Sequence, residues 1–254
     1  MASTLRKIFH RKRKPPLACS EIPLEELDSH VHTEACFLPV EPLTVLEIFQ
    51  SQGCKACIKN VPRIHEDALN PNIALLTFNV TYFDKAEWSD TFASKIWDAR
   101  QRGYVVRWGR KSVFTPEVVV DGFVDGTGTN GSEITGLIEQ ARGLRREREW
   151  NILLDANDTE LRIDSDRAES PVHEILVVFY DPAVQNVKIG KGVTKGKKLA
   201  HRNVVKRIVK AGVWEGGNLM LPLPDVPEAR GQGWGALLIV QEPQGGPIVA
   251  AHNL

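Results

Sequence analysis

Two cysteines separated by two residues are the part of this chain best suited to chemistry. They form the segment Cys54-Lys55-Ala56-Cys57. If a helix begins here, Cys54 lies at its N-terminus, where free backbone N–H groups and the positive end of the helix dipole favour a thiolate. Lys55 adds positive charge beside it. We therefore expect Cys54 to attack disulfides and Cys57, one turn into the helix, to resolve the mixed disulfide.

The elements that position this dithiol can be predicted from hydrophobic periodicity. An alternating run with β-branched residues at 44–49 predicts a strand, followed by a turn at 51–53. A helix should begin at the cysteines and run through His65. A short apolar run at 73–80 predicts a second, buried strand.

Three further elements are expected before residue 150. A helix over 85–102, ended by Gly103, is predicted because four apolar residues share one of its faces: Trp88, Phe92, Ile96 and Ala99. The run 114–120 predicts a strand closed by a turn at Asp121-Gly122. A last helix is predicted over 132–146, with Ser132 as its N-cap.

Two prolines give the dithiol a more specific context. Pro62 lies five residues after Cys57, inside the predicted helix, and Thr115-Pro116 opens a later apolar strand. This arrangement resembles the thioredoxin superfamily, in which a cis-proline lies beside the dithiol. The resemblance implies that the Thr115-Pro116 bond is cis and that the backbone of Thr115 aligns the substrate chain.

A closer resemblance, covering about residues 42–254, is to the thioredoxin-like DUF1223 family. It is carried by Leu46-Glu47-Ile48-Phe49-Gln50-Ser51-Gln52-Gly53-Cys54-Lys55-Ala56-Cys57, Asn79-Val80-Thr81-Tyr82-Phe83-Asp84 with Trp88, Arg100-Gln101-Arg102, Phe114-Thr115-Pro116-Glu117-Val118-Val119-Val120-Asp121-Gly122, Asn203-Val204-Val205-Lys206 and Gly246-Pro247-Ile248-Val249-Ala250-Ala251. The resemblance implies a fold more than a function.

The expected fold class is α/β, a thioredoxin-like domain with a second, β-rich C-terminal domain. Residues 1–41 are interpreted as a basic, mostly flexible segment, 42–148 as the thioredoxin-like domain, 149–170 as a charged linker and 171–254 as the β-rich domain. The last of these holds four strand-like runs, at 174–180, 187–189, 236–240 and 247–250.

Three other groups of residues have competing interpretations. By resemblance to thioredoxins, Asp84 is a candidate proton acceptor for the resolving cysteine, or else the cap of the helix that follows it. His30, His32 and Cys36 could form a Cys/His zinc site or an ordinary surface pair. The segment 182–210 carries nine Lys and Arg residues and no acid, which indicates a solvated face or, as the alternative, a phosphate-binding surface.

Composition limits the classes of function. The 254 residues carry no net formal charge, so the chain as a whole does not indicate a nucleic-acid partner. No apolar run is long enough for a transmembrane segment, and no apolar h-region follows the basic N-terminus. We therefore expect an intracellular protein, in the cytoplasm or, from the basic N-terminus, in mitochondria or the nucleus.

The function predicted first is a thiol-disulfide oxidoreductase acting on protein or low-molecular-weight disulfides. It needs no bound cofactor or metal, because another dithiol protein or glutathione would supply electrons. One alternative is a non-catalytic protein-binding module that keeps the thioredoxin fold as a platform. The other is a Cys/His zinc-binding protein.

Overall fold

Two parallel strands form the centre of the fold. The computed structural model describes residues 42–84, 88–148 and 152–254, and Pro42–Leu254 make up one compact unit. Within it, β1 (Thr44–Gln50) pairs in parallel with β2 (Ile73–Asn79). Every residue of β1 is buried, as expected for a strand covered on both faces.

The predictions for residues 1–41 lie outside the described residues. They include the flexible basic segment and the zinc site of His30, His32 and Cys36.

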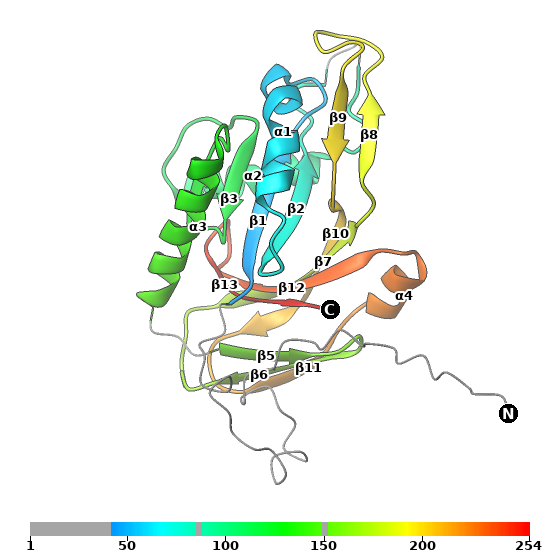
Figure 1. Ribbon diagram of the computed structural model, residues 1–254. Helices are drawn as coiled ribbons and strands as arrows, with labels where there is room; N and C mark the ends of the chain where they lie inside the picture. The colour runs from blue at the N-terminus through cyan, green and yellow to red at the C-terminus, as the bar shows by residue number, and fades with distance from the viewer. Residues whose placement is uncertain (1–41, 85–87, 149–151) are drawn as a thin grey trace, which may run out of the picture. The chain divides into compact units, whose positions relative to one another are not determined.

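One large mixed sheet extends from this centre in both directions (Figure 1). On the outer side of β1 lie β3 (Glu117–Val120) and then β4 (Val124–Gly126), both antiparallel to their neighbours. On the outer side of β2 the order is β10 (Val204–Trp214), β7 (His173–Asp181), β12 (Gly235–Gln241) and β13 (Ile248–Asn253). The mixed α/β class is confirmed, and the C-terminal strands belong to the same sheet as the dithiol segment.

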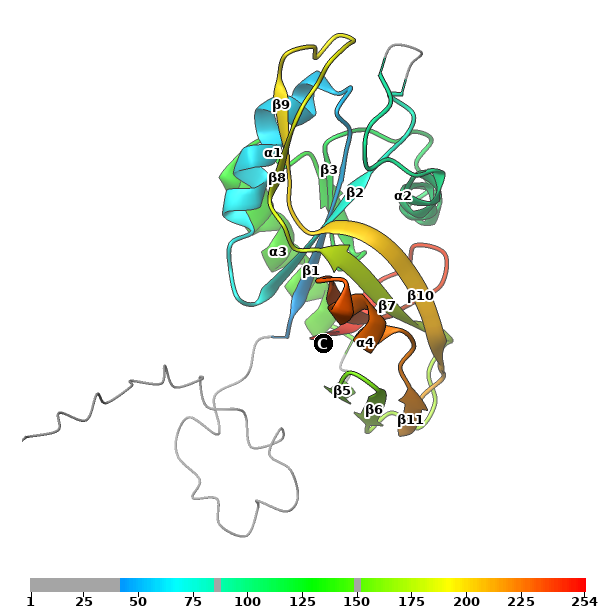
Figure 2. The same cartoon turned by 90° about the vertical axis from the view of Figure 1, so that its right-hand side faces the viewer.

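Helices cover both faces of the central strands (Figure 2). Helices α1 (Lys55–Asp67) and α3 (Gly131–Arg146) lie on one face, and α2 (Lys95–Arg107) lies on the other. Because side chains alternate along a strand, Leu46 and Ile48 pack in the cluster of α1 and α3, whereas Val45 and Phe49 pack in the cluster of α2.

Smaller elements complete the unit. A three-stranded sheet is formed by β5 (Ile152–Ala156), β6 (Glu160–Ser165) and β11 (Leu219–Pro222), and α4 (Val226–Gly231) packs on β12. A separate hairpin is formed by β8 (Gln185–Lys188) and β9 (Lys198–His201). The segment expected as a charged linker thus holds strands β5 and β6, and the basic segment 182–210 supplies β8, β9 and the start of β10.

The helix predicted over 85–102 is wrong in both of its bounds. Helix α2 begins only after Ser94, whose hydroxyl accepts a hydrogen bond from Ile96 N at 3.3 Å, and it ends at Arg107. Ile96, expected to face inward, is 67% exposed. Gly103 lies inside the helix, where the backbone of Gly245 approaches within 3.5 Å of the place a Cβ would occupy. Close packing, rather than chain reversal, therefore explains this glycine.

The other predicted elements are close to those observed. The turn at Asp121-Gly122 is present, with positive φ at both residues, and it joins β3 to β4. Helix α3 is capped by Asn130 rather than Ser132, because the Asn130 side chain accepts a hydrogen bond from Glu133 N at 2.8 Å. Across the described parts of the chain, no helix is both long and apolar enough to span a bilayer.

Candidate functional site

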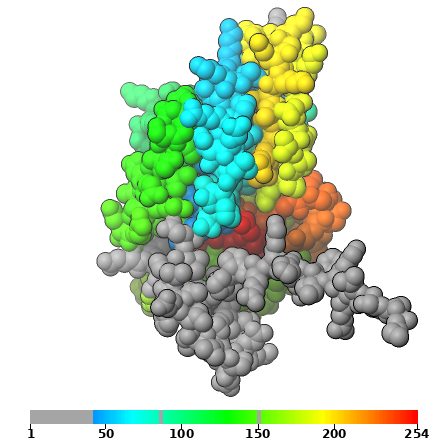
Figure 3. Space-filling view, viewed as in Figure 1, coloured from blue at the N-terminus to red at the C-terminus, as the bar shows by residue number. Residues whose placement is uncertain are grey.

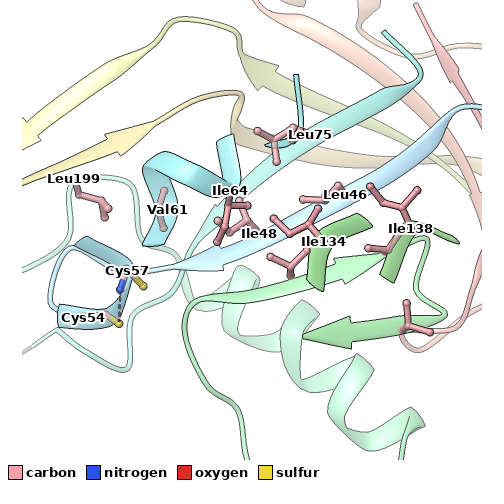
Figure 4. Packing of buried hydrophobic residues seen from close by; sticks show 14 of the residues in the cluster. Leu46, Ile48, Cys54, Cys57, Val61, Ile64, Leu75, Ile134, Ile138 and Leu199 are labelled. Carbon is pink, nitrogen blue, oxygen red and sulfur yellow. Dashed lines mark hydrogen bonds between the residues drawn. The ribbon is translucent and has the colours of Figure 1, made fainter. Parts of the chain in front are cut away.

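Cys54 lies between strand β1 and helix α1. It is the N-cap of the helix, and its Sγ accepts a hydrogen bond from Cys57 N at 3.2 Å (Figure 4). The sulfur takes the place that a Ser or Asp oxygen usually occupies in an N-cap. Ser51 O accepts a hydrogen bond from Cys54 N at 3.1 Å and so fixes the turn before the helix. The structure thus places the dithiol at a helix start, as predicted.

The two thiols differ strongly in acidity. The hydrogen bond from the Cys57 thiol is the main cause that lowers the pKa of Cys54 to about 6, and it outweighs the opposing effect of burial. Burial and the adjacent Cys54 raise the pKa of Cys57 well above its ordinary value. Hydrogen bonds therefore lower the pKa of Cys54 more than the charge of Lys55, which the sequence had suggested as a cause. Both shifts favour a thiolate at Cys54 and a protonated thiol at Cys57.

The loop before β3 brings a second backbone segment to the dithiol. The Thr115-Pro116 peptide is cis, as predicted. The Cys54 thiol, when protonated, donates a hydrogen bond to Thr115 O at 3.4 Å. Within the described residues the buried Thr115 hydroxyl has no hydrogen-bond partner of good geometry. After the hydrogen bond from Cys57, the nearby Thr115 hydroxyl is a second side chain that lowers the pKa of Cys54, whereas burial raises it.

Buried polar side chains hold this loop in place. Phe114 O accepts hydrogen bonds from Tyr82 Oη at 3.3 Å and from Gln101 Nε2 at 2.9 Å. Gln101 also donates to Glu117, which is fully buried and paired with Arg110. Burial raises the pKa of Glu117, although its hydrogen bonds oppose the shift. Tyr82, Gln101 and Glu117 belong to the motifs that carry the family resemblance, but the sequence did not indicate that they support this loop.

Asp84 occupies the loop that follows β2. Its carboxylate accepts hydrogen bonds from Ser89 Oγ at 3.1 Å and from Asp90 N at 3.0 Å. Within the described residues, no hydrogen bond joins Asp84 to either cysteine. Its role as proton acceptor stays a prediction, whereas its role in ordering this loop is observed.

A buried carboxylate that the sequence analysis missed fixes the turn before Cys54. Asp90 is 5% exposed and accepts hydrogen bonds from Gln52 N at 2.7 Å and from Asn79 Nδ2 at 2.9 Å. Burial raises the pKa of Asp90, and the hydrogen bonds oppose this. The contact with Gln52 spans 38 residues of sequence, so no local pattern could have revealed it.

The hairpin of β8 and β9 packs beside helix α1, as Figure 3 shows. Ile189 and Leu199 are buried in the same cluster as the two cysteines. At the hairpin tip, Thr194 Oγ1 donates a hydrogen bond to Gln52 O at 2.7 Å, and Thr194 is 3% exposed. Residues far downstream are therefore part of the dithiol site.

A pocket of about 340 Å³ adjoins the start of α1 and is lined by both sequence neighbours of Cys54, but not by Cys54 itself. Its lining comes from the residues on either side of the cysteine, from two aromatic rings and from the hairpin tip: Gly53, Lys55, Phe83, Trp88, Lys191, Gly192, Val193 and Thr194. Among the residues that the structure describes, no group of three or more His, Cys, Asp or Glu side chains could hold a metal ion.

Comparison with known proteins identifies the family of this chain. A family model described as a protein of unknown function, DUF1223, matches residues 45–241, which include the dithiol, the cis-proline loop and the hairpin. The chain belongs to the DUF1223 family. No curated protein matches it.

Two solved structures share the fold of this DUF1223 chain. A protein from Agrobacterium tumefaciens, studied by X-ray crystallography, is 24% identical, with a TM-score of 0.64, over 85% of this chain and 96% of the other. HBP35 of Porphyromonas gingivalis is 15% identical, with a TM-score of 0.53, over 85% of this chain and 76% of the other. At these identities the matches establish the fold alone.

Proposed function

We propose that this DUF1223 protein is a thioredoxin-like thiol-disulfide oxidoreductase that acts on protein or low-molecular-weight disulfides. The observation that carries the proposal is the position of Cys54 at the start of α1, where its Sγ accepts a hydrogen bond from Cys57 N at 3.2 Å and lies 3.4 Å from Thr115 O beside the cis peptide bond. The acidities of the two thiols agree with this position. The pKa of Cys54 is lowered to about 6 by hydrogen bonds, against the effect of burial, whereas burial raises the pKa of Cys57 well above its ordinary value. An attacking thiolate next to a protonated resolving thiol is what dithiol exchange requires.

The exchange takes two steps. The Cys54 thiolate attacks one sulfur of the substrate disulfide, forms a mixed disulfide and releases the other sulfur as a thiolate. Cys57 then gives its proton to the released thiolate, attacks Cys54 Sγ and releases the first sulfur. Two electrons pass from the dithiol to the substrate, and another dithiol protein or glutathione reduces the Cys54–Cys57 disulfide again.

The cis-proline loop supports substrate alignment in this proposal. Thr115 O lies 3.4 Å from Cys54 Sγ, so the edge of this backbone segment is next to the attacking atom. A substrate chain that pairs with Thr115 would bring its sulfur to Cys54. Tyr82 and Gln101 hold the preceding carbonyl and keep the loop in position.

The test uses the full-length chain and two cysteine variants. Wild-type protein should catalyse the reduction of insulin by dithiothreitol, and Cys54→Ser should abolish that catalysis. Cys57→Ser should accumulate a mixed disulfide with the substrate, because the attack survives and resolution does not. Equal rates for wild type and Cys54→Ser, with no adduct on Cys57→Ser, would contradict the proposal.

One observation favours a second candidate, a non-catalytic binding module. Cys54 is only 4% exposed, so a large disulfide substrate has limited access to its sulfur. In that case the cysteines would stabilise the start of α1, and partner binding would survive the Cys54→Ser substitution. Retained partner binding together with absent exchange distinguishes this candidate from the enzyme. A metal assay on the purified chain tests the Cys/His zinc alternative.

A further inference from the structure

The pocket beside Cys54 has fixed aromatic walls. Trp88 Nε1 donates a hydrogen bond to Gln52 Oε1 at 3.0 Å, which orients the indole next to the turn before the dithiol. Gly190 leaves room for this ring, because a Cβ there would lie 2.7 Å from Trp88 Cζ3. Phe83, also in the lining, packs against Gly53, where a Cβ would lie 3.0 Å from Phe83 Cβ. The walls are therefore shaped before any ligand enters.

The hairpin tip adds an apolar side chain and a basic side chain to the pocket lining. Val193 lines the pocket and is 70% exposed, so its apolar side chain is available to a ligand there. Lys55 and Lys191 are both exposed and also line the pocket. Neither lysine forms an ion pair within the described residues, and no acidic residue of that part of the chain is in the lining.

The size of the pocket restricts what it can hold. At about 340 Å³ it is near the lower limit of the 300–1,000 Å³ that is typical of small-molecule sites. It therefore suits one large side chain better than a cofactor. Its aromatic rings suit an apolar group, and its two exposed lysines suit a carboxylate beside that group.

We propose that this pocket selects protein disulfides in which the reacting cysteine is flanked by a large apolar residue and an acidic residue. The apolar side chain packs between Trp88, Phe83 and Val193. The carboxylate pairs with Lys55 or Lys191. This inference rests on the proposed function, since it names the substrate class of the same dithiol.

The test compares two cysteine peptides as mixed disulfides with thionitrobenzoate. One peptide carries Trp and Glu beside the cysteine, and the other carries Ala and Lys. Attack of Cys54 on the peptide sulfur forms the protein–peptide disulfide and releases the coloured thionitrobenzoate, and Cys57 then displaces the peptide thiol. Cys54→Ser protein gives the background from other thiols.

We expect the Trp/Glu peptide to react about tenfold faster than the Ala/Lys peptide, as partial burial of one large side chain would give. Lys191→Glu should reduce this preference, because the Glu of the peptide then meets a like charge in the pocket lining. Lys195→Glu is the matched control, because Lys195 is an exposed residue of the same tip outside the pocket lining, and it should keep the preference. Val193→Ser should slow the Trp/Glu peptide and leave the Ala/Lys peptide unchanged.

Three results would overturn the inference. They are equal rates for the two peptides, equal loss of preference in Lys191→Glu and Lys195→Glu, and faster reaction with glutathione disulfide than with either peptide. In all three, Cys54 still exchanges disulfides, so the proposed function stands while its substrate class is rejected. If Cys54 reacts with none of the disulfides, the proposed function itself fails.

Discussion

Replacing Cys57 tests the physical cause of the acidity of Cys54. The Cys57 thiol is the main hydrogen-bond donor that lowers the pKa of Cys54 to about 6. A hydrogen bond to a charged group contributes about 1.5–3 kcal/mol, and one pKa unit corresponds to about 1.4 kcal/mol. Cys57→Ala should therefore raise the pKa of Cys54 by about 1–2 units. Cys57→Ser keeps a donor at the same position and should leave the pKa near that of the wild type.

The assay is the pH dependence of alkylation by iodoacetamide, with each cysteine followed separately by mass spectrometry. At pH 6 about half of Cys54 should be thiolate, against about 0.3% of a thiol with the ordinary pKa of about 8.5. The lower intrinsic reactivity of an acidic thiolate reduces this advantage to about tenfold over an ordinary thiol. Circular dichroism should confirm that both variants are folded.

Two results would refute the reasoning. Identical pH midpoints for Cys57→Ala and Cys57→Ser would show that the side-chain donor at residue 57 is not the cause of the shift. A wild-type midpoint near that of an ordinary thiol would show that burial outweighs all the donors to Cys54.

Three further predictions concern other parts of the chain. Thr115→Val should raise the pKa of Cys54, measured by the same alkylation profile, whereas Thr115→Ser should not, because its hydroxyl is retained. Burial lowers the pKa values of His65 and His201 from 6.5 to about 4. The free energy of unfolding should therefore be highest above pH 6.5 and decrease as the pH falls towards 4, by about 3 kcal/mol per histidine at most. In urea unfolding, the decrease should be smaller for His201→Gln than for the wild type, and an equal decrease in both proteins would contradict the prediction. Asn130→Ala should lower the free energy of unfolding by about 1 kcal/mol through loss of the α3 cap, whereas Asn130→Asp should be nearly neutral.

The sequence was most informative where structure depends on near neighbours. The start of α1 at Cys54 follows from a strand, a turn and a cap within about ten residues. The helix expected over 85–102 shows the limit of such patterns. Trp88 and Phe92 matched a helical face, but Trp88 bonds to Gln52 and Phe92 packs on the ring of His201. Tertiary contacts, rather than helical periodicity, explain those two aromatic residues.

The rest of the site could not be predicted because its partners are distant in sequence. Asp90 meets Gln52 across 38 residues, and Thr194 meets the same residue across 142. The glycine-rich basic run was interpreted mainly as a solvated face. Its tip instead supplies part of the pocket lining. Only the folded structure shows which of its residues lie near the dithiol.

The distance along the chain between the dithiol and the hairpin tip has a consequence for biosynthesis. A ribosome adds about 5–20 residues per second, so the 142 residues from Gln52 to Thr194 take about 7–28 s to synthesise. During this interval Cys54 and Cys57 have been made, but the hairpin that forms part of their pocket has not. Strand β10, which pairs with the outer edge of β2, is also still to come. A nascent chain thus carries its thiol pair before the hairpin part of the pocket lining has been synthesised.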